Sequence, residues 1–243
     1  MPESANAQPV VGIIGGMGPE ATVQLMARLI ARTPARDDAD HVHVIVESNP
    51  KIPSRIAHLV EGTGEDPTPE LVRIARNLER AGATFLAMPC NTAHGYAPAI
   101  GAAVGVPLLN MVELTTARVQ ALVPGGRVGL LASTAVHKTA LYRHAFAPYG
   151  LQGVLPEDQA AVMELIQRVK RGDTGPAAGA ELARLAESFG GAVDCLLIAC
   201  TELSLLTSAL PPQPPWVDAL EVLTEAILAR ALPTVGAVMA DAT

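Results

Sequence analysis

The chain has 243 residues and a formal net charge of −7, with 49 % hydrophobic and 17 % charged residues. This hydrophobic fraction excludes an intrinsically disordered chain, and 20 prolines are too few for a collagen-like one. The acidic balance argues against a nucleic-acid partner, because nucleic-acid binders present basic surfaces. A chain of this length can bury a large core without disulfide staples, as one large domain or two small ones.

The first half alternates apolar runs with amphipathic ones, which is typical of a parallel α/β arrangement. Residues 10–14 predict a strand buried on both faces, residues 15–18 a turn, and Pro19 the first residue of a helix. The other elements expected here are strands at 41–48, 84–88 and 106–111, loops at 49–53 and 61–69, and a helix at 70–80.

The stretch between Arg80 and Glu113 carries no charged residue and is long enough to cross a membrane. Prolines, glycines and polar residues interrupt it, so we expect buried strands and a short helix there, and no membrane contact. The first ten residues lack a basic segment followed by an apolar one. We therefore expect no signal peptide and a cytoplasmic location.

The second half repeats elements of the first. Residues 127–131 resemble 10–14, and residues 195–198 resemble 85–88. Pairing Val11 with Val128 gives an offset of 117, and pairing Cys90 with Cys200 an offset of 110. Two matches in the same order indicate an internal duplication.

A proline-rich connector at 211–215 precedes a last predicted helix at 219–232, which after such a crossover can pack on the first half. We therefore predict two pseudo-symmetric α/β domains, residues 1–113 plus 213–243 and residues 114–212. Each is expected to be a parallel sheet flanked by helices, with the functional site in the cleft between them.

The three cysteines are too few for the disulfide framework of a secreted protein. Cys90 and Cys200 each lie just past the carboxyl end of a predicted strand, the edge at which open parallel sheets bind ligands. Small polar residues that can cap a helix follow both, and a helix N-terminus stabilises a thiolate, so we expect both thiols to ionise readily. Cys195, inside its strand, is expected to be a small buried hydrophobe.

Two thiols that face one cleft from opposite sides suit stereoinversion at a carbon. One base removes a proton from one face and a conjugate acid returns a proton to the other, so two residues of the same type are needed. Hydrolysis needs a nucleophile and a different base, and a disulfide oxidoreductase uses closely spaced cysteines.

Four motifs together resemble the aspartate/glutamate racemase superfamily, cofactor-independent enzymes with two pseudo-symmetric α/β domains. They are GGMGPEAT at 15–22, NPKIPSR at 49–55, PCNTAH at 89–94 and CTE at 200–202, and they span nearly the whole chain. The resemblance implies Cys90 and Cys200 as the acid/base pair, with Asn91, Thr92 and Thr201 lining the site. It also implies a small amino-acid substrate, no cofactor and a homodimer.

The subfamily follows from two of these motifs. The first strand lacks the Asp-Ser pair of glutamate racemases, and the last motif reads CTE rather than CTHYP, so the chain is similar to the aspartate racemase group. That similarity implies Arg55 and Lys170 as carboxylate binders, and Met17, Ser133 and Glu202 complete the expected substrate-binding set. Where the group usually has Gly-Thr, this chain has Ala135-Val136, which leaves a substrate other than aspartate open.

Other interpretations stay open. The same thiols suit a hydantoin racemase or a cis-dicarboxylate isomerase, and two domains can also bind an amino acid without catalysis. Residues 16–21 match a dinucleotide-binding GxGxxA with Glu47 at the end of the next strand, but that interpretation leaves the cysteines unexplained.

Metal and pyridoxal phosphate sites are further alternatives. The six histidines show no metal-ligand spacing, so we expect no metal. His94 either faces Cys90 across a helical turn or serves a capping or core role. The three lysines leave a Schiff base with pyridoxal phosphate open.

Overall fold

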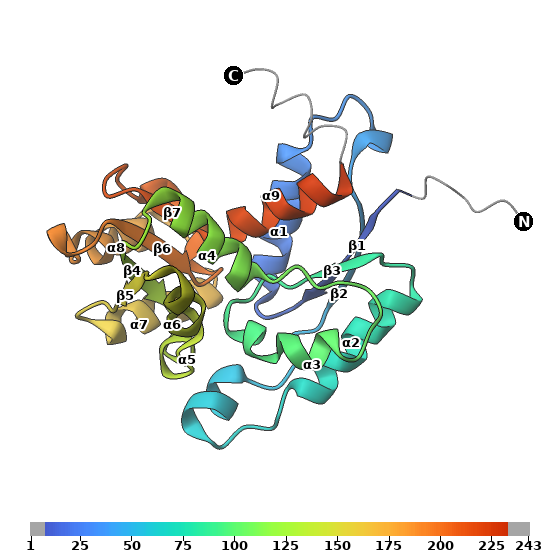
Figure 1. Cartoon of the computed structure of the whole chain (residues 1–243), viewed down its shortest axis with the longest axis horizontal. Helices are drawn as coiled ribbons and strands as arrows, with labels where there is room; N and C mark the ends of the chain where they lie inside the picture. Colours follow the sequence, from blue (N-terminus) through green and yellow to red (C-terminus); the bar gives the residue numbers. More distant parts are fainter. Residues whose placement is uncertain (1–7, 233–243) are drawn as a thin grey trace, which may run out of the picture.

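The computed structural model describes residues 8–232, which form two parallel sheets (Figure 1). The first has the strand order β2-β1-β3 and the second the order β5-β4-β6-β7. The strands are Val10–Gly15 (β1), His43–Ser48 (β2), Phe85–Ala87 (β3), Arg127–Ala132 (β4), Gln152–Val154 (β5), Cys195–Ala199 (β6) and Trp216–Asp218 (β7).

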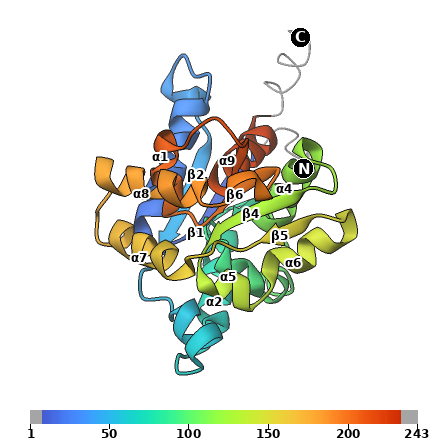
Figure 2. The same ribbon diagram turned by 90° about the vertical axis from the view of Figure 1, so that its left-hand side faces the viewer.

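Helices cover both faces of each sheet. They are Pro19–Arg32 (α1), Thr68–Arg80 (α2), Ala97–Gly101 (α3), Met111–Leu122 (α4), Thr134–Lys138 (α5), Leu141–Phe146 (α6), Gln159–Lys170 (α7), Pro176–Glu187 (α8) and Ala219–Ala231 (α9). Figure 2 shows α7 and α8 on one side of the second sheet and α4 and α6 on the other. Within residues 8–232, no helix combines the length and the apolar character that a membrane crossing requires.

The longer predicted strands and helices are confirmed to within a few residues. The strands were predictable because a strand buried on both faces needs a continuous apolar run. The strand predicted at 106–111 is wrong. Only Leu108 forms a bridge, to Leu86, and Met111 already opens α4. The helix begins there because the Asn110 side chain accepts hydrogen bonds from the backbone N–H groups of Val112 and Glu113.

The two sheets repeat one pairing scheme, as an internal duplication predicts. Gly12 of β1 lies opposite Leu86, and Gly129 of β4 lies opposite Leu196. A Cβ on Gly12 or Gly129 would come within 2.8 or 2.7 Å of the opposite leucine's Cδ2, so each glycine lets its leucine pack over the central strand.

The last helix of each half packs on the sheet of the other half. Asn110 caps α4 shortly after Leu108, which bridges to β3, and Asp218 caps α9 as the last residue of β7, which pairs with β6. Helix α9 joins the core formed by β1, β3 and α1, whereas α4 joins the core on β4, β6 and β7. The two helices contact one another between the sheets (Figure 1).

The division into domains at 1–113 plus 213–243 and 114–212 stays a prediction. The boundary after residue 113 falls inside α4, and β7, assigned to the first domain, pairs with β6 of the second sheet. Residues 1–7 and 233–243 of the predicted first domain lie outside the described residues.

Candidate active site

A cavity of about 60 Å³ lies where the carboxyl ends of strands from both sheets meet. We call it the inter-sheet cavity. All ten residues expected from the sequence line it, and Ser54, Ile56, Ile166 and Ala199 line it as well. The ten are Met17, Arg55, Cys90, Asn91, Thr92, Ser133, Lys170, Cys200, Thr201 and Glu202.

Backbone geometry brings the two N-terminal motifs to this cavity. Gly16, just after β1, has a φ of +93°, which disfavours any residue with a side chain. A Cβ on Gly16 would lie 2.4 Å from the carbonyl carbon of Asn49. Because the two loops approach so closely, Met17 and Arg55 reach the same cavity.

The two candidate thiols hold equivalent positions. Cys90 follows β3 and Cys200 follows β6, and both are free and buried, with 7 % and 8 % of their surface exposed. Cys195 lies within β6, fully buried, and does not line the inter-sheet cavity. The third cysteine is therefore a core residue, as expected.

Cys200 is held as a thiol. Its Sγ donates a hydrogen bond to Glu202 Oε2 at 3.0 Å, and Lys170 Nζ lies 3.6 Å from Glu202 Oε1. Burial and the Glu202 carboxylate raise the pKa of Cys200 well above its ordinary value, although Lys170 opposes the shift. The expectation that this thiol ionises readily is wrong, because burial and Glu202 raise its pKa and because short 3₁₀ turns, not an α-helix, follow it.

The polar residues after each cysteine do not cap helices, contrary to expectation; their side chains bond across the two halves. Thr92 Oγ1 lies 3.1 Å from Ser133 Oγ, and Thr201 Oγ1 donates to the Pro89 carbonyl oxygen at 3.2 Å. Asn91 Oδ1 accepts a hydrogen bond of 2.6 Å from the Tyr142 hydroxyl. Sequence reasoning missed Tyr142, since no motif links it to the PCNTAH segment.

Two hydrogen-bond donors at the cavity have no partner among the described residues. They are Asn91 Nδ2 and Arg55 Nε, and both atoms are buried. Arg55 Nη1 meanwhile donates to the Pro53 carbonyl oxygen at 2.9 Å, which holds the guanidinium in place. Buried polar groups are nearly always paired, so these two donors are suited to an acceptor such as a carboxylate.

His94 has a capping role, because both of its ring nitrogens bond to backbone atoms. Its Nδ1 donates to the Cys90 carbonyl oxygen at 2.8 Å, because its Nε2 accepts from the Met111 backbone N–H at 3.0 Å. The ring therefore joins the turn after Cys90 to the start of α4.

His94 makes stability depend on pH. Burial lowers the pKa of His94 below the ordinary 6.5. In mild acid this histidine is therefore protonated in the unfolded chain and neutral in the folded chain. We expect the free energy of unfolding to fall as the pH drops below about 6.5 and to be insensitive to this group above that value. Urea unfolding at several pH values gives the free energy of unfolding as a function of pH. Below about pH 6.5 this free energy should change less with pH in His94→Gln than in the wild type. His144→Gln, at an exposed histidine, is the control and should keep the wild-type slope.

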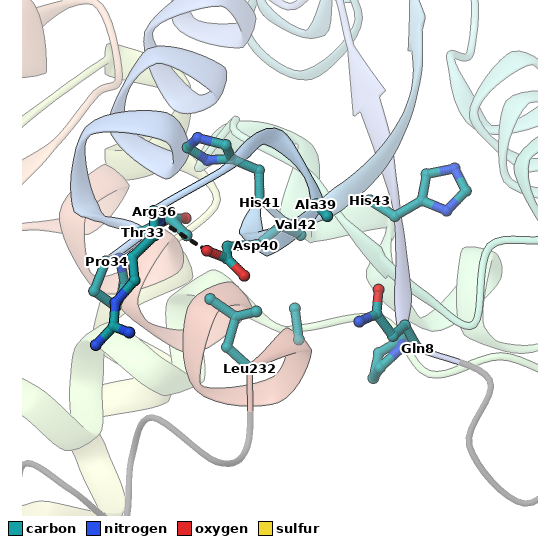
Figure 3. A pocket seen from close by; sticks show the side chains of 12 residues that line it. Gln8, Thr33, Pro34, Arg36, Ala39, Asp40, His41, Val42, His43 and Leu232 are labelled. Carbon is teal, nitrogen blue, oxygen red and sulfur yellow. Dashed lines mark hydrogen bonds between the residues drawn. The ribbon is translucent and has the colours of Figure 1, made fainter.

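A second hollow, of about 370 Å³, lies beside the amino ends of β1 and β2 (Figure 3). Its acidic residue, Asp40, accepts hydrogen bonds from the backbone N–H groups of Arg36 at 2.7 Å and Asp37 at 3.1 Å. That carboxylate therefore stabilises its own turn, and no cysteine lines the hollow.

The carboxylate invoked for dinucleotide binding is also engaged. Glu47 accepts hydrogen bonds from Arg73 at 2.7 Å and Asn77 at 3.0 Å. At the end of β2, each of its oxygens is thus bound to a side chain of α2, so the carboxylate has a structural role in joining β2 to α2.

Comparison with known proteins identifies the family. The model of the Asp/Glu/hydantoin racemase family matches residues 14–227. The chain is 27 % identical to the broad specificity amino-acid racemase RacX of Bacillus subtilis, over 92 % of this chain and 98 % of that protein. It is 32 % identical to the Picrophilus torridus aspartate racemase, with a TM-score of 0.81 over 92 % of this chain and 94 % of that one.

A more distant structure shares the fold. The glutamate racemase of Thermus thermophilus, solved with β-chloro-D-alanine, is 18 % identical, with a TM-score of 0.64 over 94 % of this chain and 82 % of that one. The chain belongs to the Asp/Glu/hydantoin racemase family, and the α/β fold and the racemase activity expected from its sequence are confirmed.

Proposed function

We propose that the protein is a cofactor-independent amino-acid racemase that inverts Cα with the thiols of Cys90 and Cys200, with aspartate as its substrate. One observation carries the proposal: two buried cysteines at equivalent positions of the two halves line one cavity with unpaired donors. The Picrophilus torridus relative, an aspartate racemase, supports this choice of substrate. The homodimer and the cytoplasmic location stay predictions.

The substrate carboxylates would bind the donors that the protein leaves unpaired. Asn91 Nδ2 and Arg55 Nε are each suited to an anionic oxygen, and Lys170 adds a second positive charge. Holding the α-carboxylate by charged donors also stabilises the carbanion that forms when Cα loses its proton.

The two thiols then exchange roles. With Cys90 as thiolate, it takes the α-proton from one face while the Cys200 thiol gives its proton to the opposite face of Cα. Cys200 is suited to start as the acid because Glu202 accepts its hydrogen bond. In the reverse direction Cys200 acts as the thiolate, and Lys170 compensates its charge beside Glu202.

A broad-specificity racemase is the second candidate. The Glu202 carboxylate pairs with Lys170, which weakens the attraction of Lys170 for a second substrate carboxylate. Among the described residues that line the cavity, Arg55 is then the cation without a carboxylate partner. A single free cation suits amino acids with one carboxylate. The Bacillus subtilis relative, a broad specificity racemase, favours the same candidate.

Proton NMR in D₂O, with no added cofactor, tests the proposal on a panel of L-amino acids, a hydantoin and a cis-dicarboxylate. Loss of the aspartate α-proton signal, with D-aspartate found by chiral chromatography, is the expected result. Exchange only with neutral amino acids would favour the second candidate. Conversion of only the hydantoin or the cis-dicarboxylate, or binding of aspartate without exchange, would overturn the proposal.

Glu202→Gln should make Cys200 more reactive. Removing the carboxylate charge lowers the pKa of Cys200, so more thiolate forms at a given pH. We expect iodoacetamide to alkylate Cys200 severalfold faster in the variant, and the alkaline limb of kcat/KM to move to lower pH. Mass spectrometry quantifies the alkylation, with Cys90 in the same cavity as the internal reference. An unchanged Cys200 rate would show that Glu202 does not control this thiol.

A further inference from the structure

The Asn91 amide lies at the junction of the two halves. It follows Cys90, lines the inter-sheet cavity and is 3 % exposed. Its two ends have different surroundings, because Oδ1 accepts the Tyr142 hydroxyl at 2.6 Å while Nδ2 has no partner among the described residues. Which end faces the cavity decides whether Asn91 offers a donor or an acceptor to a ligand.

Tyr142 is a rigid support for this amide. It belongs to α6 of the second half, is 1 % exposed and packs against Phe146, with ring centroids 5.5 Å apart. Its hydroxyl group donates a hydrogen bond to Asn91 Oδ1. If the amide were turned over, its NH₂ group would face the hydroxyl in place of Oδ1 and this buried hydrogen bond would be lost, which is costly in a core.

We propose that Tyr142 is a positioning residue that holds the Asn91 amide with Nδ2 available to the carboxylate of the substrate. This rests on the proposed function, since it assigns a substrate contact to Asn91. The hydroxyl acts across the junction, so a side chain of the second half orients a binding group of the first.

Tyr142→Phe tests the proposal because it keeps the ring and removes only the hydroxyl. Losing one oriented hydrogen bond should raise KM roughly tenfold and change kcat less than about threefold. In an Asn91→Ala background, the same substitution should leave KM unchanged. Tyr149→Phe, at an exposed tyrosine of the same half, is the control and should behave as wild type. Thermal unfolding of each variant checks that it is folded.

Asn91→Asp gives a second, independent test. The aspartate keeps an oxygen for Tyr142 but offers no donor, so KM should rise at least as much as in Tyr142→Phe. An equal KM increase from Tyr142→Phe in the wild-type and Asn91→Ala backgrounds would mean that Tyr142 acts through general packing. That result, or an unchanged KM in Tyr142→Phe, would overturn the proposal.

A spectroscopic readout separates this proposal from the proposed function. In ¹⁵N-labelled protein the Asn91 side-chain NH₂ signals, identified by their absence in Asn91→Ala, should shift and broaden in Tyr142→Phe as the amide loses its fixed orientation. That change is expected even if no amino acid is racemised, whereas unchanged signals would overturn the positioning role.

Discussion

Cys90→Ala and Cys200→Ala are each expected to lower the racemisation rate by about 10³-fold or more, within the usual range for removing an acid–base group. Each substitution removes the group that serves one face of Cα, so inversion stops in both directions. Chiral chromatography of the product from either enantiomer measures the loss. Cys195→Ala should keep the wild-type rate, because Cys195 lies within β6 and does not line the cavity.

The two variants should also differ from one another. The thiol that remains can still take the α-proton from one enantiomer and return a deuteron to the same face. In D₂O we therefore expect Cys90→Ala and Cys200→Ala to exchange the α-proton of opposite enantiomers without inverting them. A wild-type racemisation rate in either variant would disprove the two-thiol mechanism.

Arg28→Met is expected to lower the free energy of unfolding by about 3–5 kcal/mol, since it leaves the buried Asp218 carboxylate without its positively charged partner. Arg28 Nη1 lies 2.6 Å from Asp218 Oδ2, and its Nη2 donates to the Ser204 carbonyl oxygen at 2.9 Å. Asp218 is 4 % exposed and caps α9 by accepting from the Leu220 backbone N–H. Urea unfolding of the variant and the wild type gives the difference.

Arg32→Met is the matched control, one helical turn further along α1. Arg32 is half-exposed and pairs with Glu221 and Glu225 at the surface, so we expect a cost below about 1 kcal/mol. Asp218→Asn in the Arg28→Met background should recover part of the loss. Equal effects of Arg28→Met and Arg32→Met would contradict the importance of the buried pair.

The strands that could be predicted from sequence are those with the strongest pattern. Central strands β1, β4 and β6 are apolar over five or more residues, because helices cover both of their faces. The three-residue strands β5 and β7 are too short to show any periodicity, whereas β3, of the same length, lies within a longer apolar run. The prediction of a strand at 106–111 was wrong, because this segment pairs with β3 through a single bridge at Leu108.

The location of the candidate site could also be predicted from the sequence. The order of strands places residues near 17 and 90 at the carboxyl edge of the first sheet, and residues near 133 and 200 at that of the second. The duplication then predicted that these two edges face one cleft. The state of Cys200 could not be predicted, since it depends on the turn that folds Glu202 back to its thiol. Tyr142 was missed because it reaches Asn91 through tertiary packing between α6 and the turn after Cys90.

The exchange of α4 and α9 between the sheets makes the two halves interdependent in folding. A fragment that ends before α4 would lack α9, and Val11, Phe85 and the apolar side of α1 would face water. The second half alone would equally expose the face of its sheet that Val112 and Val119 cover. Neither half can complete its own core, so the chain should unfold in one cooperative transition rather than half by half.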